Sequence, residues 1–505
     1  MSLNYNFIWL LCYLLVLVGL AGYGFHRLSI VYLYWKNRNN KPQPKARFQE
    51  LPVVTVQLPM FNEKFVVDRL LESVAALDYP QDKLEIQILD DSTDDTTEQC
   101  YRKVEELKSR GFDAVCIHRT DRTGFKAGAL EAATKVAKGG LLLILDADFV
   151  PEPDLLQKTI HFFTDENVGL VQTRWGHINR EYNLLTRIQG MYLDGHFAME
   201  QTARNRSGRF FTFNGTAGIW RKCVIGDAGG WSHDTLTEDM DLSYRVQLRG
   251  WRFIYLNDVV TPAELPVDMD GFKSQQHRWT KGSIQVCQKI LLDIWRSNAP
   301  LKAKVEATTH LTCNYSYLLL ALLCFLVYPI CTQRIPENET VFMWFVNVAL
   351  FFMTSVAVCI FYMSAQIVVR PKSWWKELPY LPLLLTLSVG MAVNNAKAVL
   401  EAIFGHQSAF VRTPKYGVDR KEDRRHVSQL KRNGYRAIKS VVIPVLEIAC
   451  GTFFLNLIII MIRQGHYLSP ILMIPFLGFY YTGFCSLGRM ISNLLPAKQT
   501  AKAKN

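Results

Sequence analysis

The chain has 505 residues, which is longer than one ordinary domain. Hydrophobic residues make up 49% of it and charged residues only 20%, and this balance excludes a wholly soluble protein. The formal net charge is +12, but the basic residues flank apolar blocks and accompany no zinc-knuckle or recognition-helix pattern, so nucleic acid is not an expected partner. None of the 11 cysteines forms a C-x-x-C pair, which favours small buried side chains in a reducing compartment.

The first apolar segment, residues 7–25, carries no charge and is long enough to cross a lipid bilayer. It lacks the basic start and the cleavage site of a signal peptide, and basic residues follow it as far as Arg47. Because positively charged loops stay on the cytoplasmic side, residues 1–36 are expected to form a transmembrane anchor whose N-terminus lies outside.

Between residues 50 and 265, strand-like and helix-like patterns alternate. Short runs of β-branched and aliphatic residues predict strands at 53–58, 84–89, 114–118 and 141–145. Amphipathic stretches predict helices near 65–77, 94–109 and 126–138. Such alternation is typical of βαβ units, so an α/β domain with a mostly parallel sheet is expected.

The second half contains five apolar blocks, each long enough to cross a membrane, at 311–331, 341–369, 378–396, 441–462 and 468–487. If all five crossed, the basic tract 412–439 would lie outside, against the positive-inside rule. An interfacial or re-entrant segment at 378–396 removes this conflict. The sequence therefore predicts five spans in a multi-pass α-helical membrane protein.

Two carboxylates, Asp146 and Asp148, follow the strand predicted at 141–145 with one small residue between them. Mg²⁺ and Mn²⁺ prefer oxygen ligands and are often shared with substrate phosphates, so this spacing suits a divalent cation bound to a diphosphate. A turn or helix cap before Pro151 is the alternative interpretation.

Asp90 and Asp91 end another predicted strand, and the polar residues 92–95 that follow resemble a helix N-cap cluster. Carboxylates at the carboxyl ends of neighbouring strands converge on the ligand crevice of an open α/β sheet, where one of them can bind a base or ribose. Lys126 follows a Gly-Phe pair and precedes Ala-Gly, and it is placed to meet a phosphate because glycines permit close backbone approach.

Two further signatures lie downstream. Residues 237–239 read Thr-Glu-Asp before a helix-like stretch, and Asp239 can be either a helix cap or the general base that takes a proton from an acceptor hydroxyl. Residues 275–279 read Gln-Gln-His-Arg-Trp, in which Arg278 can hold a diphosphate bidentately and Trp279 offers a flat face to a sugar ring. An interfacial Trp–Arg anchor at the membrane is the alternative.

In this order, the four signatures resemble the D,D,D,QxxRW pattern of the membrane-embedded, inverting family 2 glycosyltransferases. The resemblance covers residues 50 to about 417 and is greatest to the cellulose-synthase-like glucomannan synthases. Further matching runs are Leu-Pro-Met-Phe-Asn-Glu at 58–63, Phe-Asn-Gly-Thr-Ala-Gly at 213–218 and Phe-Val-Arg-Thr-Pro-Lys at 410–415. The last run resembles a gating loop over the active site, F-x-V-T-x-K in cellulose synthases, from which it departs at Arg412.

The resemblance implies the GT-A fold of nucleotide-diphospho-sugar transferases, inserted between transmembrane helices. It implies that Asp239 is the catalytic base. It also implies that the nucleotide sugar is bound by Asp90, Lys126, Asp146 and Arg278, and Mg²⁺ or Mn²⁺ by Asp146 and Asp148. The residues implied to contact the acceptor are Phe213, Asn214, Gly215, Thr216, Gln275 and Trp279, and those implied to gate the site are Phe410, Thr413 and Lys415.

The expected division of the chain follows from the spans and the resemblance together. It comprises an anchor (1–36), a GT-A domain (50–265), interfacial helices with QxxRW (266–305), two transmembrane helices (306–370), an interfacial segment with the gating loop (371–440), two further transmembrane helices (441–490) and a basic cytoplasmic tail (491–505).

The implied activity is processive, inverting β-transfer of a hexose from GDP-mannose or UDP-glucose to a growing polysaccharide, with export through the membrane domain. The catalytic domain is expected in the cytoplasm, in a bacterial inner membrane or the Golgi. Non-processive glucosylation of a lipid acceptor, diacylglycerol or ceramide, is the enzymatic alternative, and a transporter or channel is the non-enzymatic one. The gating signature and the number of C-terminal spans favour a polymer, and a transporter explains none of the ordered carboxylates.

One carboxylate, Glu447, lies inside the apolar block 441–462, where a charge is expensive. It is expected either to pair with Lys439 or Arg436 near the cytoplasmic end or to line a polymer channel.

Overall fold

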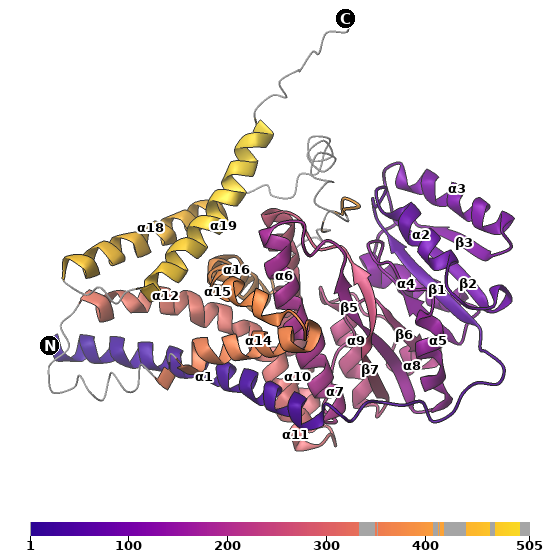
Figure 1. The fold of residues 1–505 in the computed structure, drawn as a ribbon, viewed down its shortest axis with the longest axis horizontal. Helices are drawn as coiled ribbons and strands as arrows, with labels where there is room; N and C mark the ends of the chain where they lie inside the picture. Colours follow the sequence, from indigo (N-terminus) through magenta and orange to yellow (C-terminus); the bar gives the residue numbers. More distant parts are fainter. Residues whose placement is uncertain are drawn as a thin grey trace, which may run out of the picture.

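A β-sheet domain occupies one end of the molecule and long helices occupy the other (Figure 1). The computed structural model describes residues 2–332, 349–350, 352–407, 413, 415–418, 441–464 and 470–494. Within these residues the sheet has seven strands in the order β3-β2-β1-β4-β6-β5-β7.

The first half of the sheet follows the alternation predicted from the sequence. Its parallel strands are β1 (Val54–Met60), β2 (Leu84–Asp90), β3 (Asp113–His118) and β4 (Leu141–Ile144). The intervening helices are α2 (Val67–Ala75), α3 (Thr96–Ser109) and α4 (Phe125–Val136), with the 3₁₀ turn η1 (Gln81–Lys83) before β2. Strands β1, β2 and β4 are almost wholly buried, which explains their continuous apolar runs.

The second half of the sheet was not predicted strand by strand. It contains β5 (Val168–His177), β6 (Gly218–Arg221) and β7 (Arg252–Ala263). Strand β6 runs antiparallel to both β4 and β5, whereas β5 and β7 are parallel. The sheet is therefore mixed, with one reversed strand in an otherwise parallel order.

Because β6 is reversed, its start lies at the same edge of the sheet as the ends of the parallel strands. The parallel strands end at that edge, whereas β6 begins there, so the loop before β6 lies beside the residues that follow β4. The carboxyl ends of β5 and β7 reach the same edge because both run parallel to β4. Ligands of open α/β sheets bind at this edge.

Helices cover both faces of the sheet and bury it. One apolar cluster joins β1 and β2 to α2 and α3 through residues such as Val56, Leu70 and Val104. A second joins β4 to α4, α8 (Lys222–Asp227) and α9 (Glu238–Leu248) through Leu142 and Leu130. The remaining short elements of this end are α5 (Leu155–Thr159) and η2 (Ile160–Thr164).

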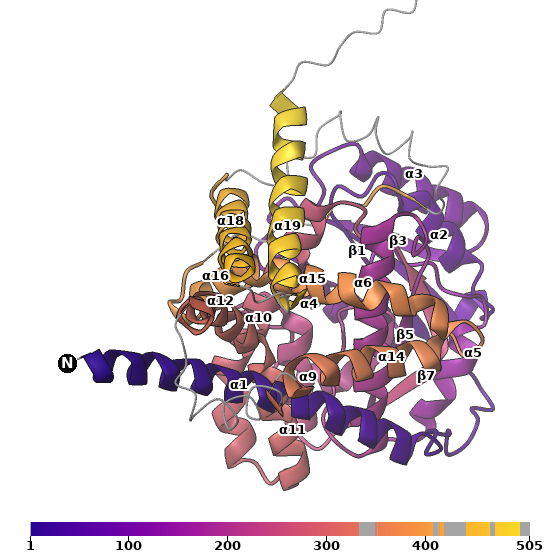
Figure 2. The same cartoon turned by 60° about the vertical axis from the view of Figure 1, so that its left-hand side comes forward.

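A third layer of helices connects the sheet to the long helices. It consists of α6 (Leu184–Asp194), the π-helix η3 (Gly195–Gln201), α7 (Thr202–Arg206), α10 (Met269–Arg296), α11 (Leu301–Thr312) and η4 (Cys313–Tyr315). The long helices themselves are α1 (Ser2–Asn37), α12 (Ser316–Thr332), η6 with α14 (Phe352–Val356, Ala357–Val369), η7 with α15 (Trp374–Tyr380, Leu381–Gly390), α16 (Ala392–Ile403), α18 (Val442–Arg463) and α19 (Pro470–Leu494). Figure 2 shows α12, α16 and α18 close together on one side of the molecule and α3 on the other.

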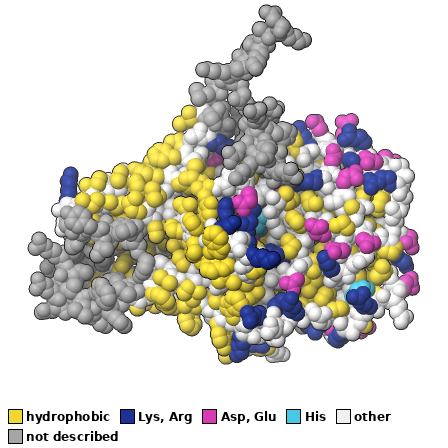
Figure 3. All heavy atoms as spheres, in the orientation of Figure 1, with side chains coloured by type: hydrophobic (Ala, Val, Ile, Leu, Met, Phe, Trp, Pro, Cys, Tyr) yellow, Lys and Arg dark blue, Asp and Glu magenta, His cyan; other side chains and the backbone are white. Residues whose placement is uncertain are grey.

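Four helical segments in the described part of the chain are long and apolar enough to cross a membrane: Ile8–Asn37, Leu301–Tyr328, Phe352–Val369 and Val442–Arg463. A fifth candidate is the pair formed by Trp374–Gly390 and Ala392–Ile403, which is bent by 42°, the shape of a broken span or a re-entrant loop. Hydrophobic side chains cover this end of the molecule, whereas charged ones gather over the sheet (Figure 3). The chain is thus built as a membrane protein, and the count of five spans stays a prediction.

Glu447 has a partner that the sequence did not predict. Its side chain is completely buried, and its carboxylate lies 2.5 Å from the Nζ atom of Lys273 in α10. Lys273 also donates to the backbone oxygen of Thr482 and to Ser486 in α19. The carboxylate therefore ties α18 and α19 to α10, while Lys439 and Arg436 lie outside the described residues.

Candidate active site

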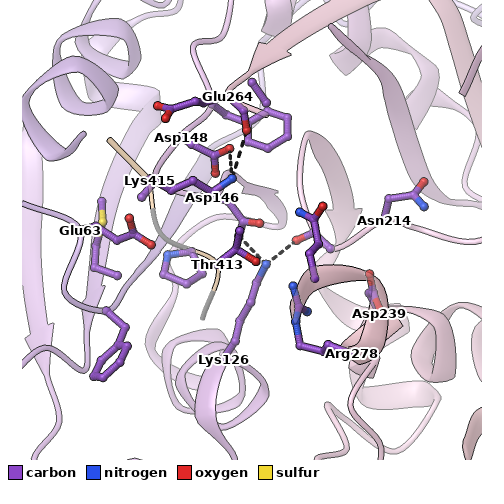
Figure 4. Close-up of a pocket in the computed structure, with 18 of the residues that line it drawn as sticks. Glu63, Lys126, Asp146, Asp148, Asn214, Asp239, Glu264, Arg278, Thr413 and Lys415 are labelled. Carbon is purple, nitrogen blue, oxygen red and sulfur yellow. Dashed lines mark hydrogen bonds and ion pairs between the residues drawn. The ribbon is translucent and has the colours of Figure 1, made fainter. Parts of the chain in front are cut away.

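A cavity of about 180 Å³ opens at the edge of the sheet where the strand ends converge. All four sequence signatures contribute to its wall. The residues involved are Asp91, Asp146, Asp148, Glu238, Asp239, Gln275, Arg278 and Trp279. Figure 4 shows Asp146 and Asp148 after β4, with Asp239 of α9 and Arg278 of α10 across from them.

Lys126 is held at the centre of this cavity. It stands in the first turn of α4, and its Nζ atom lies 2.5 Å from Asp146 Oδ1 and 2.9 Å from the backbone oxygen of Gly215. Burial lowers the pKa of this amine, but Asp146 and Glu238 outweigh the effect and raise the pKa above its ordinary value. A charged lysine in this position can meet a phosphate group.

The start of α4 is positioned by Asp91, which accepts two hydrogen bonds from Arg119, at 2.8 Å from Nε and 2.6 Å from Nη2. The same guanidinium donates to the backbone oxygen of Phe125. A bidentate pair of this kind fixes orientation as well as distance. Asp91, directly after β2, therefore fixes the first turn of α4, from which the Lys126 side chain extends into the cavity.

Asp148 is held by a second lysine. Lys415 Nζ lies 2.6 Å from Asp148 Oδ2 and 3.2 Å from the backbone oxygen of Glu264, which follows β7 (Figure 4). The buried Glu264 carboxylate in turn accepts from the backbone N–H groups of Tyr416, Gly417 and Val418, at 3.0, 3.0 and 3.2 Å. Glu264 therefore fastens residues 415–418 against the cavity, and burial raises its pKa.

Asp239 stands in the first turn of α9, where a backbone N–H from Met240 reaches its Oδ1 atom at 2.8 Å. Burial and the neighbouring Glu238 carboxylate raise the pKa of Asp239 to about 7, while Lys126, the Met240 N–H and Arg278 act in the opposite direction. A carboxylate with a pKa near neutrality can accept a proton and release it again, which suits a general base.

Gly215 lies between the two charged groups. Its φ is +80°, and a Cβ atom there would lie 3.1 Å from Asp239 Oδ2 and 3.5 Å from Lys126 Nζ. A side chain is thus disfavoured both by backbone conformation and by space. The glycine keeps the approach to Asp239 open.

Helix α10 places the last signature. Asp268 caps it by accepting from the backbone N–H of Gly271 at 2.9 Å. Lys281 and His277 both contact Glu401 of α16, at 3.0 and 3.3 Å, which fixes the helix from its other side. Gln275, Arg278 and Trp279 consequently face the cavity.

Some of the predicted site residues do not line the cavity. Asp90 is completely buried and accepts from Thr97, His118 and the backbone of Ser92, so Asp91 rather than Asp90 reaches the cavity wall. Phe213 and Thr216 are also buried behind the surface.

Thr216 supports Asp146 instead, because its hydroxyl accepts from the Asp146 backbone N–H at 2.8 Å. Asn214, Gly215, Thr413 and Lys415 line the cavity as expected, and Phe410 lies outside the described residues.

Other lining residues were not predicted from the sequence. They are Glu63, Arg122, Trp175, His177 and Glu264. Arg122 lies 3.3 Å from the ring centre of Phe61 and forms a flat, charged wall. Glu63 ends the matching run 58–63 but was given no role, and no local pattern marks the other four.

The donor set is compatible with a divalent cation shared with a substrate. Asp146 and Asp148 provide oxygen ligands, and both already hold a cationic amine at 2.5–2.6 Å. Among the described residues, no cluster of three or more His, Cys, Asp or Glu side chains could enclose a metal. Mg²⁺ or Mn²⁺ can instead bind through one or two carboxylates when phosphate oxygens complete its shell. The residues present fit such a cation.

Two family models match this chain. "Glycosyltransferase like family 2" matches residues 52–282, and "Cellulose synthase" matches residues 218–464. Each model covers a little under half of the chain, and the two overlap at residues 218–282, so a region similar to family 2 glycosyltransferases is followed by a region similar to cellulose synthases.

Curated proteins similar to this chain include glucomannan 4-beta-mannosyltransferase 2 of Arabidopsis thaliana, which is 42% identical over 286 residues, or 54% of this chain and 53% of the relative. Glucomannan 4-beta-mannosyltransferase 1 of Oryza sativa subsp. japonica is 40% identical over 277 residues, with the same two shares. The chain thus spans about half the length of the curated relatives it matches.

Among solved structures, the chain is similar to a mannosyltransferase from Pyrobaculum calidifontis in complex with GDP-Man and Mn²⁺. The TM-score is 0.56 at 19% identity, and the match covers 78% of this chain and all of the other. The likeness confirms the GT-A fold predicted for the sheet domain.

Proposed function

We propose that the protein is a processive, inverting β-glycosyltransferase that transfers a hexose from a nucleotide diphosphate sugar to a growing polysaccharide. The observation that carries this proposal is the cavity in which Asp239 faces Lys126, Arg278 and the Asp146–Asp148 pair. The relatives named for mannosyl transfer favour GDP-mannose over UDP-glucose as the donor.

The donor diphosphate is expected between the sheet edge and α10. Lys126 of α4 and Arg278 of α10 both supply positive charge to the cavity, and Arg278 offers the planar fork that matches phosphate oxygens. Asp146 and Asp148 would hold Mg²⁺ or Mn²⁺, which neutralises negative charge on the departing diphosphate when bound.

Inversion follows from a single displacement. Asp239 takes the proton of an acceptor hydroxyl while the new C–O bond forms and the bond to the nucleotide diphosphate breaks. The acceptor oxygen must therefore approach from the side of α9, opposite the leaving group. Gly215 leaves space for that approach, and Trp279 offers an apolar face to the acceptor sugar.

A small second cavity of about 20 Å³, with polar and apolar walls, lies beside α10. It lies between α6, α10, α12, α15 and α16, and its polar lining includes Gln189, Tyr192, Gln276, Tyr317 and Asn395. Gln276 adjoins Gln275, which lines the main cavity. Polar and aromatic side chains at this point suit a sugar chain that leaves the site along α10 into the membrane helices.

The orientation proposed for the protein places the sheet domain in the cytoplasm, where nucleotide sugars are available. The basic residues after α1 and in the tract 412–439 support this sidedness through the positive-inside rule.

The experiment that tests the proposal uses membranes that contain the full chain, incubated separately with radiolabelled GDP-mannose and UDP-glucose. The expected product is insoluble in organic solvent and is released by an endo-β-mannanase. A β-glucanase-sensitive product would change the assigned sugar. Label recovered in the lipid extract would contradict a polysaccharide acceptor, and no transfer from either donor would contradict the activity.

A further inference from the structure

Asn214 lies in the wall of the main cavity, and its side chain is held from behind by two others. Gln201 Nε2 donates to Asn214 Oδ1 at 2.6 Å, and Asn214 Nδ2 lies 2.9 Å from His196 Nε2. Both partners belong to η3, the π-helix over Gly195–Gln201. Single π-turns inside helical segments are often found at functional sites.

The direction of every hydrogen bond in this group can be deduced from one backbone carbonyl. Gln201 Nε2 also lies 2.7 Å from the backbone oxygen of Thr212, which can only accept, so this atom must be the amide nitrogen. The Asn214 atom that faces it must then be the oxygen. It follows that the Asn214 nitrogen faces His196, and that His196 Nε2 accepts.

His196 is therefore neutral and carries its proton on Nδ1. That proton points at Glu200, whose Oε2 atom lies 3.0 Å away. Burial, Arg204 and Arg27 lower the pKa of His196 to about 3, so the neutral form persists at physiological pH. A protonated ring would set two donors against each other at Asn214.

Glu200 is itself held by charges from other helices. Arg204 of α7 lies 3.2 Å from the Oε2 atom of Glu200, and Arg27 of α1 pairs with its Oε1 atom. Arg204 also bonds Glu306 of α11 at 2.9 Å. The imidazole is consequently fixed by groups that belong to the membrane-facing helices rather than to the sheet.

The backbone of Asn214 is fixed independently. Its N–H reaches Gln172 Oε1 at 3.3 Å, and the Gln172 amide donates to the backbone oxygens of Thr216 and Ala217. With both backbone and side chain held, Asn214 keeps one N–H and one oxygen lone pair for the cavity. A donor and an acceptor side by side match a sugar hydroxyl, which can accept and donate in turn.

We propose that His196 is a positioning residue that sets the Asn214 carboxamide to bind a hydroxyl of the acceptor sugar, with Gln201 and Glu200 fixing the orientation. The inference rests on the proposed function, because it requires a sugar acceptor in the cavity. It adds that helix α1 helps to orient the acceptor site, because Arg27 holds Glu200, Glu200 holds His196, and His196 holds Asn214.

The test compares His196→Gln, His196→Asn and Asn214→Ala in the full-length protein. Glutamine places an acceptor oxygen near the position of Nε2, whereas asparagine reaches only the position of Nδ1 and leaves Asn214 without its partner. Initial rates are measured with a soluble β-manno-oligosaccharide acceptor at saturating donor, together with the affinity for the free nucleotide diphosphate.

We expect His196→Asn to raise the KM for the acceptor about tenfold, the effect of one lost hydrogen bond, while nucleotide affinity stays within about twofold of wild type. His196→Gln is expected to restore most of that loss. The double variant His196→Asn/Asn214→Ala is expected to be no worse than Asn214→Ala alone, because both changes remove the same contact.

Additive losses in the double variant would overturn the assignment of His196. So would equal losses with glutamine and asparagine, or a parallel loss of nucleotide affinity, since these indicate a merely structural role. If the wild-type protein transfers sugar and these outcomes appear, only the positioning role fails. If the wild type transfers sugar to no saccharide acceptor, the proposed function fails and this inference fails with it.

Discussion

The two sides of the cavity are built differently. On the side of Asp91, Asp146 and Asp148, the residues follow strands β2 and β4, whose places are set by the backbone ladder of the sheet. On the side of Asn214, Asp239 and Arg278, the residues stand on a loop and two helices that side-chain contacts hold in place. The first side is thus positioned by local structure and the second by contacts between distant segments.

The largest effect is expected at Asp239. Asp239→Asn keeps the shape of the side chain but cannot accept a proton, so transfer should fall by about 10²–10⁴-fold. Donor binding, measured by titration with the nucleotide diphosphate, should change little if the two sides act separately. A variant that keeps near-normal turnover would remove Asp239 as the base.

The native protein offers a control for that prediction. Because the pKa of Asp239 is raised to about 7, the carboxylate is protonated below that pH and cannot act as a base. The kcat/KM for the acceptor should therefore rise with pH up to about 7 and then level. A profile that falls over this range would contradict the assignment.

A different pattern is expected on the sheet side. Asp148→Ala should weaken metal-dependent donor binding as well as the rate, by at least the 10–100-fold that loss of a supporting residue typically costs a metal site, about 1.4–2.7 kcal/mol. EDTA should abolish activity, and Mg²⁺ or Mn²⁺ should restore it in the wild type. Activity that survives EDTA would contradict a role for a divalent cation in donor binding.

Glu264 belongs to both sides of this comparison. It directly follows strand β7 of the sheet, and its carboxylate holds the backbone of the distant segment 415–418. Glu264→Ala leaves three backbone N–H groups without their acceptor, and a lost partner of this kind costs about 1–3 kcal/mol. We expect the KM for the donor to rise about tenfold. Glu264→Gln keeps an acceptor oxygen and should lose less; equal losses would assign the effect to charge alone.

The smallest effect on the chemistry is expected at Lys273. Lys273→Met leaves Glu447 buried without its partner, which should lower the free energy of unfolding by about 3–5 kcal/mol. The double variant Lys273→Met/Glu447→Met removes both charges and should recover most of that loss, as measured by thermal unfolding in detergent. Residual activity per folded molecule should be similar in all three proteins. A double variant as unstable as the single one would show that the pair itself is not the cause.

The sheet side could be predicted from the sequence because its information is local. Buried parallel strands read as continuous apolar runs, and the residues at their ends follow directly, which placed Asp146 and Asp148 correctly. The same reasoning could not separate Asp90 from Asp91, since one residue of register decides which carboxylate faces the cavity. The structure selects Asp91.

The other side could not be predicted in the same way. Glu264 follows a strand that the sequence did not reveal, and its function depends on backbone groups about 150 residues away. The partner of Glu447 is separated from it by 174 residues. Pairing across such distances depends on the whole fold, so reasoning from sequence neighbours could not find Lys273; the expected partners Lys439 and Arg436 lie outside the described residues.

The pair between Lys273 and Glu447 also bears on how the chain is assembled in the membrane. A lone charged side chain inside an apolar helix opposes insertion by about 2.5–3.5 kcal/mol. Lys273 is synthesised before Glu447, so its amine is available when α18 enters the bilayer. Docking of α10 against α18 and α19 therefore compensates the Glu447 carboxylate, and a chain in which α10 is misplaced would leave this charge without Lys273.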